Sequence, residues 1–255
     1  MTPLISVIMP VHNGIPFLAE AIRSILDQSF DDFEFVIIDD ASTDESLEIA
    51  GSIADPRVVL VRNERQLGIA RTLNRGLAEA RGRLVARMDA DDVADPHRFA
   101  RQQEYLSRRS GPGVVGSNAV LIDRNGAEIG TERYPASARD IRRSILIHNP
   151  FAHGAVMLTR SLLDRHGVYD PAFLHNEDYD LWLRLDAAGT DMANVQESLF
   201  RRRIHDRNIT VARQRELVAY RCRTLAHAVF RYYRNPLLAV HLVRPALAYL
   251  SRLGR

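Results

Sequence analysis

Short apolar runs alternate with longer stretches of helical periodicity over residues 4–88, and this alternation constrains the fold more than any other feature. The apolar runs are rich in branched residues and bounded by polar ones, as buried strands are. Strand alternating with helix implies crossover connections, and therefore an α/β fold with a mostly parallel, Rossmann-like sheet flanked by helices. The expected strands are residues 4–9, 34–38, 58–61 and 84–88, and the expected helices are 15–26, 46–53 and 69–80.

The pattern continues less regularly through the rest of the chain. Asp95 is expected to cap the next helix, with Pro96 in its first turn. Residues 123–126 (Asp-Arg-Asn-Gly) predict a hairpin turn, and Ser137 with Asp140 resembles a capping box. The further expected elements are helix 96–109, strand 113–122, helix 137–147, strand 155–158, helix 178–188, strand 198–204 and helices from 213 onward.

Charge divides the chain into two parts. The whole chain has 34 basic and 32 acidic residues, but from Arg213 onward nine arginines accompany a single acid, Glu216. A slightly acidic body with a basic tail does not suggest a nucleic-acid-binding protein, whose basic residues line its folded face. We therefore expect a main domain over residues 1–212 and a basic, amphipathic helical tail over residues 213–255. The tail is expected either to contact an anionic membrane surface or to pack on the main domain or on a second subunit.

Cysteine content and the N-terminus indicate the cellular setting. The single cysteine, Cys222, excludes an internal disulfide and a cysteine-based zinc cluster, which favours a reducing compartment. The N-terminal residues lack the pattern of a signal peptide, and no apolar stretch reaches the roughly 18 residues of a membrane-spanning helix. We expect a cytoplasmic protein, located at the inner face of the membrane if the tail binds lipid.

Polar clusters follow three of the expected strands, at residues 10–14 (Pro-Val-His-Asn-Gly), 39–44 (Asp-Asp-Ala-Ser-Thr-Asp) and 89–92 (Asp-Ala-Asp-Asp). Ligands of such sheets bind beyond the carboxyl ends of the strands, so these clusters are the expected site. Asp89 and Asp91 concentrate negative charge that Mg²⁺ or Mn²⁺ would compensate, and such a cation can also hold a diphosphate. A solvated acidic turn that caps the next helix is the alternative interpretation.

The other two clusters also have structural interpretations. Residues 10–14 suit a strand-to-helix turn that uses asparagine and glycine for backbone freedom. Ser42 and Glu45 fit a capping box for the following helix. Asp40 is not needed for that cap, and its carboxylate could accept a hydrogen bond from a uracil N–H or a ribose hydroxyl.

Taken together, the three clusters resemble glycosyltransferase family 2, whose members are inverting enzymes of the GT-A fold. The resemblance extends over residues 4–210 and includes Leu-Gly-Ile-Ala-Arg-Thr-Leu-Asn at 67–74 and Asn-Glu-Asp-Tyr-Asp-Leu-Trp-Leu-Arg at 176–184. It implies transfer of a sugar from a nucleotide-diphosphate donor, with UDP favoured, to a hydroxyl of a glycan or lipid-linked acceptor. It also implies a divalent cation, Mn²⁺ or Mg²⁺, and a role in cell-surface polysaccharide synthesis. Residues 1–212 would then be the catalytic domain.

The resemblance implies roles for individual residues. Asp178 is the expected catalytic base, which takes the proton of the acceptor hydroxyl, and Glu177 is the second candidate. Asp91 is expected to bind the metal, together with Asp89 and His205. The expected donor contacts are Pro10, His12, Asp40, Arg71 and Asp89, and His153 is expected to shape the donor or acceptor pocket. The structural alternatives are that Asp178 only caps its helix, that Arg71 is an exposed helix residue and that His205 is structural.

Two other functions fit part of the pattern. A nucleotidyltransferase would have a similar sheet and a metal-bound nucleotide, but its first strand is typically followed by a glycine-rich, basic loop, and residues 10–14 contain no lysine or arginine. A non-catalytic module that binds nucleotides or glycans would be expected to lack Asp91 or Asp178, and both are present.

Overall fold

Strand β1 (Ile5–Val11) lies inside the parallel half of the sheet, between β2 (Phe33–Asp39) and β4 (Leu84–Arg87). β3 (Val58–Arg62) extends this half beyond β2. The parallel arrangement predicted from the sequence is therefore confirmed. The computed structural model describes residues 2–109, 111, 113–206 and 214–242.

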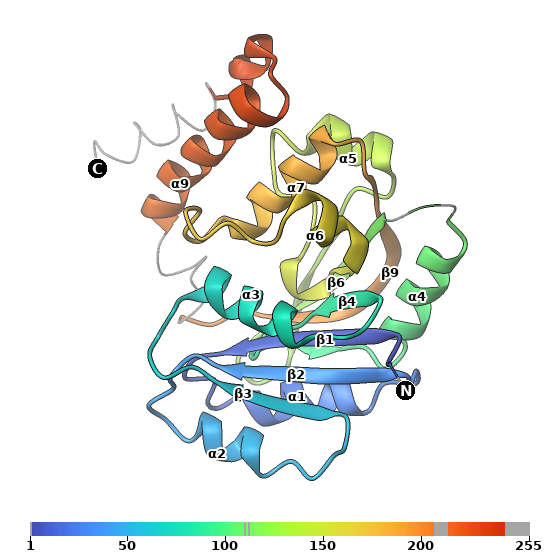
Figure 1. Cartoon of the computed structure of the whole chain (residues 1–255), viewed down its shortest axis with the longest axis vertical. Coiled ribbons are helices and arrows are strands. Elements are labelled where there is room, and N and C mark those ends of the chain that lie inside the picture. Colours follow the sequence, from blue (N-terminus) through green and yellow to red (C-terminus); the bar gives the residue numbers. More distant parts are fainter. Residues whose placement is uncertain (1, 110, 112, 207–213, 243–255) are drawn as a thin grey trace.

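Helices cover both faces of the parallel half. α1 (Leu18–Leu26) and α2 (Ser46–Gly51) lie on one face, and α3 (Ile69–Glu79) lies on the other (Figure 1). Successive residues of β1 serve the two sides, because Val7 packs in the core with α1 whereas Ile8 packs in the core with α3. A strand buried on both faces is apolar at nearly every position, which explains the continuous apolar runs in the sequence.

The other half of the sheet contains antiparallel strands. β8 (Met157–Thr159) pairs antiparallel with β4 and with β6 (Gly113–Ile122), and β9 (Asp191–Arg203) runs parallel to β6. The expected hairpin is confirmed, because β7 (Glu128–Glu132) pairs antiparallel with β6. β5 (Val93–Ala94) pairs with β9 at the edge. The order is β3-β2-β1-β4-β8-β6-β9-β5, with β7 beside β6.

Four elements differ from the expectation. β9 begins at Asp191 rather than at residue 198. β5 and α6 (Arg160–His166) were not expected, and both are too short to show a hydrophobic period of their own. The turn before β8 is a 3₁₀ helix, η1 (His153–Ala155), so that strand begins two residues later than expected.

Two of the three predicted helix caps are wrong. α4 (Arg98–Ser107) begins after His97, and the Asp95 carboxylate instead accepts the backbone N–H of His97 at 2.9 Å. At α2, Asp44 rather than Ser42 accepts the N–H of Ser46, at 3.0 Å. In both places a side chain bonds its own turn two residues on, a local alternative to the cap. The cap of α5 (Ala138–Ser144) is confirmed, with Ser137 accepting the N–H of Asp140 at 3.3 Å.

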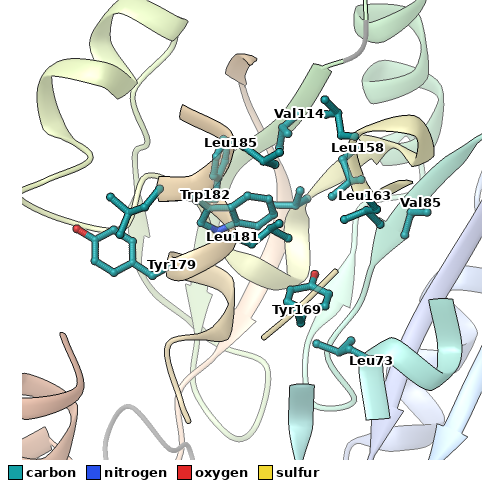
Figure 2. Close-up of a cluster of buried hydrophobic side chains, with 14 of the residues drawn as sticks. Leu73, Val85, Val114, Leu158, Leu163, Tyr169, Tyr179, Leu181, Trp182 and Leu185 are labelled. Atoms are coloured by element: carbon teal, nitrogen blue, oxygen red, sulfur yellow. The ribbon is translucent and has the colours of Figure 1, made fainter. Parts of the chain in front are cut away.

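Helix α7 (Glu177–Ala187) crosses the antiparallel half and carries much of its core. Trp182 and Leu185 are fully buried, and they cluster with Val114 of β6 and Leu158 of β8 (Figure 2). The first turn of this helix contains the segment expected to supply the base, so its position is fixed by a large apolar anchor one turn further on.

The C-terminal helices pack on α7. They are α9 (Gln214–His227), the π-helical turn η2 (Ala228–Tyr232) and the 3₁₀ helix η3 (Pro236–Leu242), and they project from one end of the molecule (Figure 1). Leu225 and Ala228 are fully buried in the α7 core cluster. The phenol of Tyr232 donates to Asp180 at 2.7 Å, and the phenol of Tyr233 donates to Asp186 at 2.6 Å.

Packing on the main domain, one of the two alternatives for the tail, therefore describes the inner side of these helices. Leu225 and Val229 fill the core, and Tyr232 and Tyr233 bond α7, so these four side chains lie on the packed side of the tail and do not face a membrane. Residues 213 and 243–255 of the expected tail lie outside the described residues. In the part of the chain that the structure describes, no helix is both long and apolar enough to cross a bilayer.

Candidate active site

A cavity of about 900 Å³ opens at the carboxyl ends of β1 and β4, the edge at which the polar clusters were expected to bind ligands. This volume is within the range of small-molecule sites. Its lining residues come from segments far apart in the sequence: most of residues 10–17, 149–154 and 200–205, all of 43–44 and 89–92, and Tyr134 and Asp178. The clusters at 10–14 and 89–92 thus share one site with the first turn of α7 and the end of β9.

Asp91 and His205 form a pair at the cavity. The Nε2 atom of His205 lies 3.0 Å from Oδ2 of Asp91, although 114 positions separate the two residues in the sequence. The imidazole ring packs beside the ring of Phe17, with 5.0 Å between the centroids. The structure thus brings together two of the three residues expected to bind a metal.

Asp89, the third of these residues, is engaged by Arg87 of β4. The Oδ1 atom of Asp89 lies 2.6 Å from Nη1 of Arg87, whose side chain is 6% exposed. Burial raises the pKa of Asp89, and the charge of Arg87 opposes this effect. Asp89 remains 34% exposed and lines the cavity, so it can contact a ligand while Arg87 holds its orientation.

Asp178 faces the same cavity from the first turn of α7. The side-chain amide of Asn149 donates to its Oδ2 at 2.7 Å, and the backbone N–H of Tyr179 donates to its Oδ1 at 2.7 Å. Burial raises the pKa of Asp178, and the hydrogen bond from Asn149 limits the increase. A carboxylate that lines a cavity and has a raised pKa is suited to accept a proton.

Glu177, the second candidate for the base, lies behind Asp178. Its side chain is buried and does not belong to the lining of the cavity. Burial, together with the charge of Asp178, raises the pKa of Glu177 to about 8, so this carboxyl carries a proton at neutral pH. The geometry therefore favours Asp178 over Glu177 as the group that meets a substrate.

Pro10 and His12 line the cavity as expected. The Nδ1 atom of His12 lies 2.9 Å from the backbone oxygen of Asp40, which joins the end of β1 to the end of β2. Asn13 strengthens this connection, because its side-chain oxygen accepts the N–H of Thr43 at 2.8 Å.

Asp40 and Arg71 do not belong to the lining of the cavity. The Asp40 carboxylate accepts hydrogen bonds from Asn63 Nδ2 at 2.7 Å and from the backbone N–H groups of Leu67 and Gly68 at 2.8 and 3.0 Å. The Asp40 carboxylate therefore organises the loop before α3. Both of its oxygens accept hydrogen bonds from the protein itself, and neither lines the cavity. Arg71 is exposed in the first turn of α3, as the structural alternative held. Their donor contacts stay predictions without structural support.

The structural interpretation of Asp40 predicts a loss of stability in Asp40→Ala. Three buried or half-buried donors would lose their acceptor, which costs about 2–3 kcal/mol of unfolding free energy. Burial alone would raise the pKa of Asp40, but the hydrogen bonds from Leu67 and Asn63 hold it below its usual value. Its contribution is therefore complete above the ordinary aspartate pKa and is lost as the pH falls through the lower folded value.

Urea unfolding of wild type and Asp40→Ala, at pH 7 and at low pH, measures this loss. The difference in unfolding free energy should shrink at low pH, and nucleotide binding by the folded variant should change little. If Asp40→Ala instead keeps wild-type stability and loses nucleotide binding, the result would support the predicted contact of Asp40 with the nucleoside. Asp31→Ala is the matched control, because Asp31 is 88% exposed and lies outside the cavity lining, so both quantities should stay unchanged.

Several residues that line the cavity could not be predicted from the sequence. Tyr134 and Arg202 both bond Glu132, with the Tyr134 phenol donating at 2.7 Å and Arg202 Nη2 donating at 2.6 Å. Asn149, which orients Asp178, also lines the cavity. None of these residues belongs to a polar cluster at a strand end, and the partners of Arg202 and Asn149 lie far away in the sequence, so no local pattern identifies them.

His153 lies in the cavity wall as expected. Its Nε2 atom is 2.9 Å from the phenol oxygen of Tyr169. Burial, together with the charge of Arg87, holds the pKa of His153 well below its usual value, so the ring is neutral at pH 7. A neutral ring at this position can contribute shape and one hydrogen bond to the site.

An α/β sheet with an acidic turn after β4, and a carboxylate facing that turn across one cavity, is the arrangement expected of a glycosyltransferase of the GT-A fold. The chain belongs to glycosyl transferase family 2, whose sequence model matches residues 6–167. The O-antigen biosynthesis glycosyltransferase WbnJ of Escherichia coli is 33% identical over 225 residues, which cover 85% of this chain and 84% of WbnJ. The predicted family and fold class are therefore confirmed.

Two solved structures share the fold. TarS residues 1–349 of S. aureus, in complex with UDP-GlcNAc, superposes with a TM-score of 0.73 at 17% identity, covering 97% of this chain and 72% of that one. The mannosyltransferase PcManGT from Pyrobaculum calidifontis, in complex with GDP-Man and Mn²⁺, gives a TM-score of 0.67 at 20% identity, covering 98% and 76%. At these identities the likeness extends to the fold and not to the ligands.

Proposed function

We propose that this glycosyltransferase moves a sugar, with inversion, from a UDP-sugar to a hydroxyl of a glycan or lipid-linked acceptor. One observation carries the proposal: the Asp91–His205 pair and the Asp178 carboxylate line the same cavity from different elements. The Asp91–His205 pair suits a cation that holds the diphosphate of a donor. The Asp178 carboxylate suits the hydroxyl of an acceptor. Uridine is proposed as the base from the family resemblance alone, because TarS was solved with UDP-GlcNAc whereas PcManGT was solved with GDP-Man.

The charge of the cavity supports a divalent cation. Five aspartates line it (Asp44, Asp89, Asp91, Asp92 and Asp178), against two arginines, Arg202 and Arg203. A diphosphate would be repelled from this wall unless a cation joined the two. Carboxylate oxygen and imidazole nitrogen are ligands that Mn²⁺ or Mg²⁺ accepts.

Asp91 and His205 would hold that cation, and Asp89 would orient the donor ribose or sugar. Among the described residues, no group of three or more His, Cys, Asp or Glu side chains is arranged to hold a metal alone. A site with two protein ligands fits a cation that takes its remaining ligands from substrate phosphates and water. When bound, such a cation neutralises charge on the departing diphosphate.

Asp178 would perform the proton transfer. The acceptor hydroxyl oxygen forms a bond to the anomeric carbon while the bond from that carbon to the diphosphate breaks on the opposite side. The hydroxyl proton passes to the Asp178 carboxylate. Asn149 holds Oδ2 of this carboxylate, so the base is oriented before the acceptor arrives. A single displacement of this kind inverts the anomeric configuration.

We propose cell-surface polysaccharide synthesis as the pathway, and the cytoplasm as the compartment. WbnJ acts in O-antigen biosynthesis, which supports this assignment. Residues 1–212 stay our proposed catalytic domain, with residues 213–255 as a helical appendage. The contacts of Tyr232 and Tyr233 with α7 attach the described part of that appendage to the domain.

A donor screen tests the proposed function. Purified protein is incubated with UDP-, GDP- and dTDP-sugars, with and without Mn²⁺, and thermal shift and nucleotide release are recorded. We expect stabilisation by a UDP-sugar only with the cation, and slow release of UDP. Formation of a nucleotide sugar from a nucleoside triphosphate and a sugar phosphate would instead establish a nucleotidyltransferase. If a nucleotide sugar stabilises the protein but no glycan acceptor tested gives turnover, the result would favour a binding module.

A further inference from the structure

Exposed large apolar side chains gather in the C-terminal helices. Phe230 is 57% exposed, Leu237 82% and Val240 64%, the three highest values for large apolar residues in the described part of the chain. All three lie within eleven consecutive residues, directly beyond the helix that packs on α7. From this concentration and the charge around it, we propose that the outer surface of residues 218–242 docks on an anionic lipid bilayer.

The helical geometry separates this outer surface from the packed side. Leu225 and Val229 are fully buried, and Tyr232 reaches α7. Arg223 in α9, Phe230 in η2 and Arg234 in the loop before η3 are all exposed, so none of them belongs to the packed side. Leu237 and Val240 in η3 are three residues apart, and side chains at this spacing eclipse each other in a 3₁₀ helix. The outer surface is therefore amphipathic in composition, with apolar side chains beside exposed arginines.

The charge of the segment matches an anionic surface. Residues 218–242 contain four arginines and no aspartate or glutamate. Arg221 lies over the ring of Tyr179, 5.9 Å from its centroid, whereas Arg223, Arg231 and Arg234 are exposed. Exposed apolar side chains beside cations, without acids, suit the boundary between lipid headgroups and acyl chains.

A second copy of the chain is a poorer occupant of this surface. In a symmetric dimer the same patch meets itself, so the arginines of one copy would face those of the other. Such like-charge contacts oppose association, whereas anionic lipid compensates all three charges at once. The bilayer is therefore the occupant to which the observed charges point.

The outer surface is connected to the active site through α9. Tyr220 of α9 contacts His175, with 5.6 Å between their ring centroids, and His175 precedes α7 by two residues. Ten residues of helix separate Tyr220 from Phe230, which corresponds to about 15 Å. Docking would thus bring the Asp178 end of α7 close to a membrane that presents a lipid-linked acceptor. Only this last consequence rests on the proposed function, since lipid binding itself does not require it.

Vesicle co-sedimentation tests the proposal with the full chain. The probes are vesicles of phosphatidylcholine alone and of phosphatidylcholine with phosphatidylglycerol, each at low and high salt. We expect binding to the anionic vesicles that weakens with salt. Phe230→Ser/Leu237→Ser/Val240→Ser should reduce binding at least about tenfold. Arg223→Gln/Arg231→Gln/Arg234→Gln should reduce it about a hundredfold, at roughly fivefold per arginine, and weaken the salt dependence.

Matched controls come from exposed residues elsewhere. Ile129→Ser changes a side chain that is 56% exposed on β7, and Arg65→Gln/Arg139→Gln/Arg143→Gln removes three exposed arginines of the main domain. Both should bind as wild type does, and all variants should keep the wild-type melting temperature, because the changed side chains are exposed. Wild-type binding by both outer-surface variants would overturn the proposal. So would a dimer in light scattering that these variants dissociate, since a second copy would then occupy the surface.

Discussion

Asp178→Asn is expected to lower the turnover number by about 10²–10⁴-fold while donor binding stays nearly unchanged. Asparagine keeps the shape and can still bond Asn149 after an amide flip, but it cannot take a proton. The loss should therefore appear in kcat and in kcat/KM, and not in the dissociation constant of the nucleotide sugar. Initial rates with the donor identified by screening, together with calorimetric titration of that donor, measure the two quantities.

Glu177→Gln is the matched control for this prediction. The pKa of about 8 means that Glu177 is already protonated at neutral pH, so an amide reproduces its charge state. We expect its effect on turnover to be much smaller than that of Asp178→Asn. A larger loss of turnover in Glu177→Gln than in Asp178→Asn would show that Glu177, and not Asp178, is the base.

The rate should depend on pH through Asp178. The base acts in its ionised form, so the rate falls as the pH drops through its pKa. Because burial raises this pKa, the fall in kcat/KM should begin at a higher pH than for an ordinary aspartate. This limb should be absent from the residual activity of Asp178→Asn.

Asp91→Asn is expected to remove the cation dependence of nucleoside diphosphate binding, with a loss of affinity of more than about a hundredfold in the presence of Mn²⁺. The variant loses the negative charge and one oxygen ligand at the position where the diphosphate would approach a wall of aspartates. His205→Ala should lose less, because the carboxylate remains. Titration of UDP into each variant, with Mn²⁺ and with EDTA, gives the comparison.

Asp31→Asn serves as the control for Asp91→Asn. The Asp31 side chain is 88% exposed and does not belong to the cavity lining, so this variant changes the net charge by the same amount without touching the site. Its cation dependence should equal that of wild type. An undiminished Mn²⁺ effect in Asp91→Asn would remove Asp91 from the proposed metal site.

The sequence predicted best those features that depend on short segments. Both faces of β1, β2 and β4 are buried, so each strand is visible as an apolar run, and the residues that follow each run must meet at one edge of the sheet. Asp91 could be found in this way. The pairing of His205 with Asp91, and the position of Asp178 in the same cavity, required the family resemblance, because these residues lie 114 and 87 positions from Asp91.

Features decided by competing local or distant partners could not be predicted. Asp95 and Ser42 have the composition of helix caps, yet Asp95 bonds its own turn and Ser42 accepts the N–H of Asn13. The donors that engage Asp40 include Asn63, 23 positions away. The tail shows the same difficulty, because tyrosines and leucines among arginines suit both a membrane surface and a protein surface. Only the positions of Asp180 and Asp186 decide that Tyr232 and Tyr233 face inward.

The two phenol contacts restrict insertions and deletions more than substitutions. Tyr232 and Tyr233 are consecutive, yet they bond carboxylates six positions apart on α7, about 9 Å along its axis. Adding or removing one residue between the buried Leu225 and Tyr232 would rotate both phenols away from their partners and leave two buried carboxylates without them. Related chains that keep these four residues should therefore keep the spacing from Leu225 to Tyr232, while the outer side of the same helices is free to change its side chains.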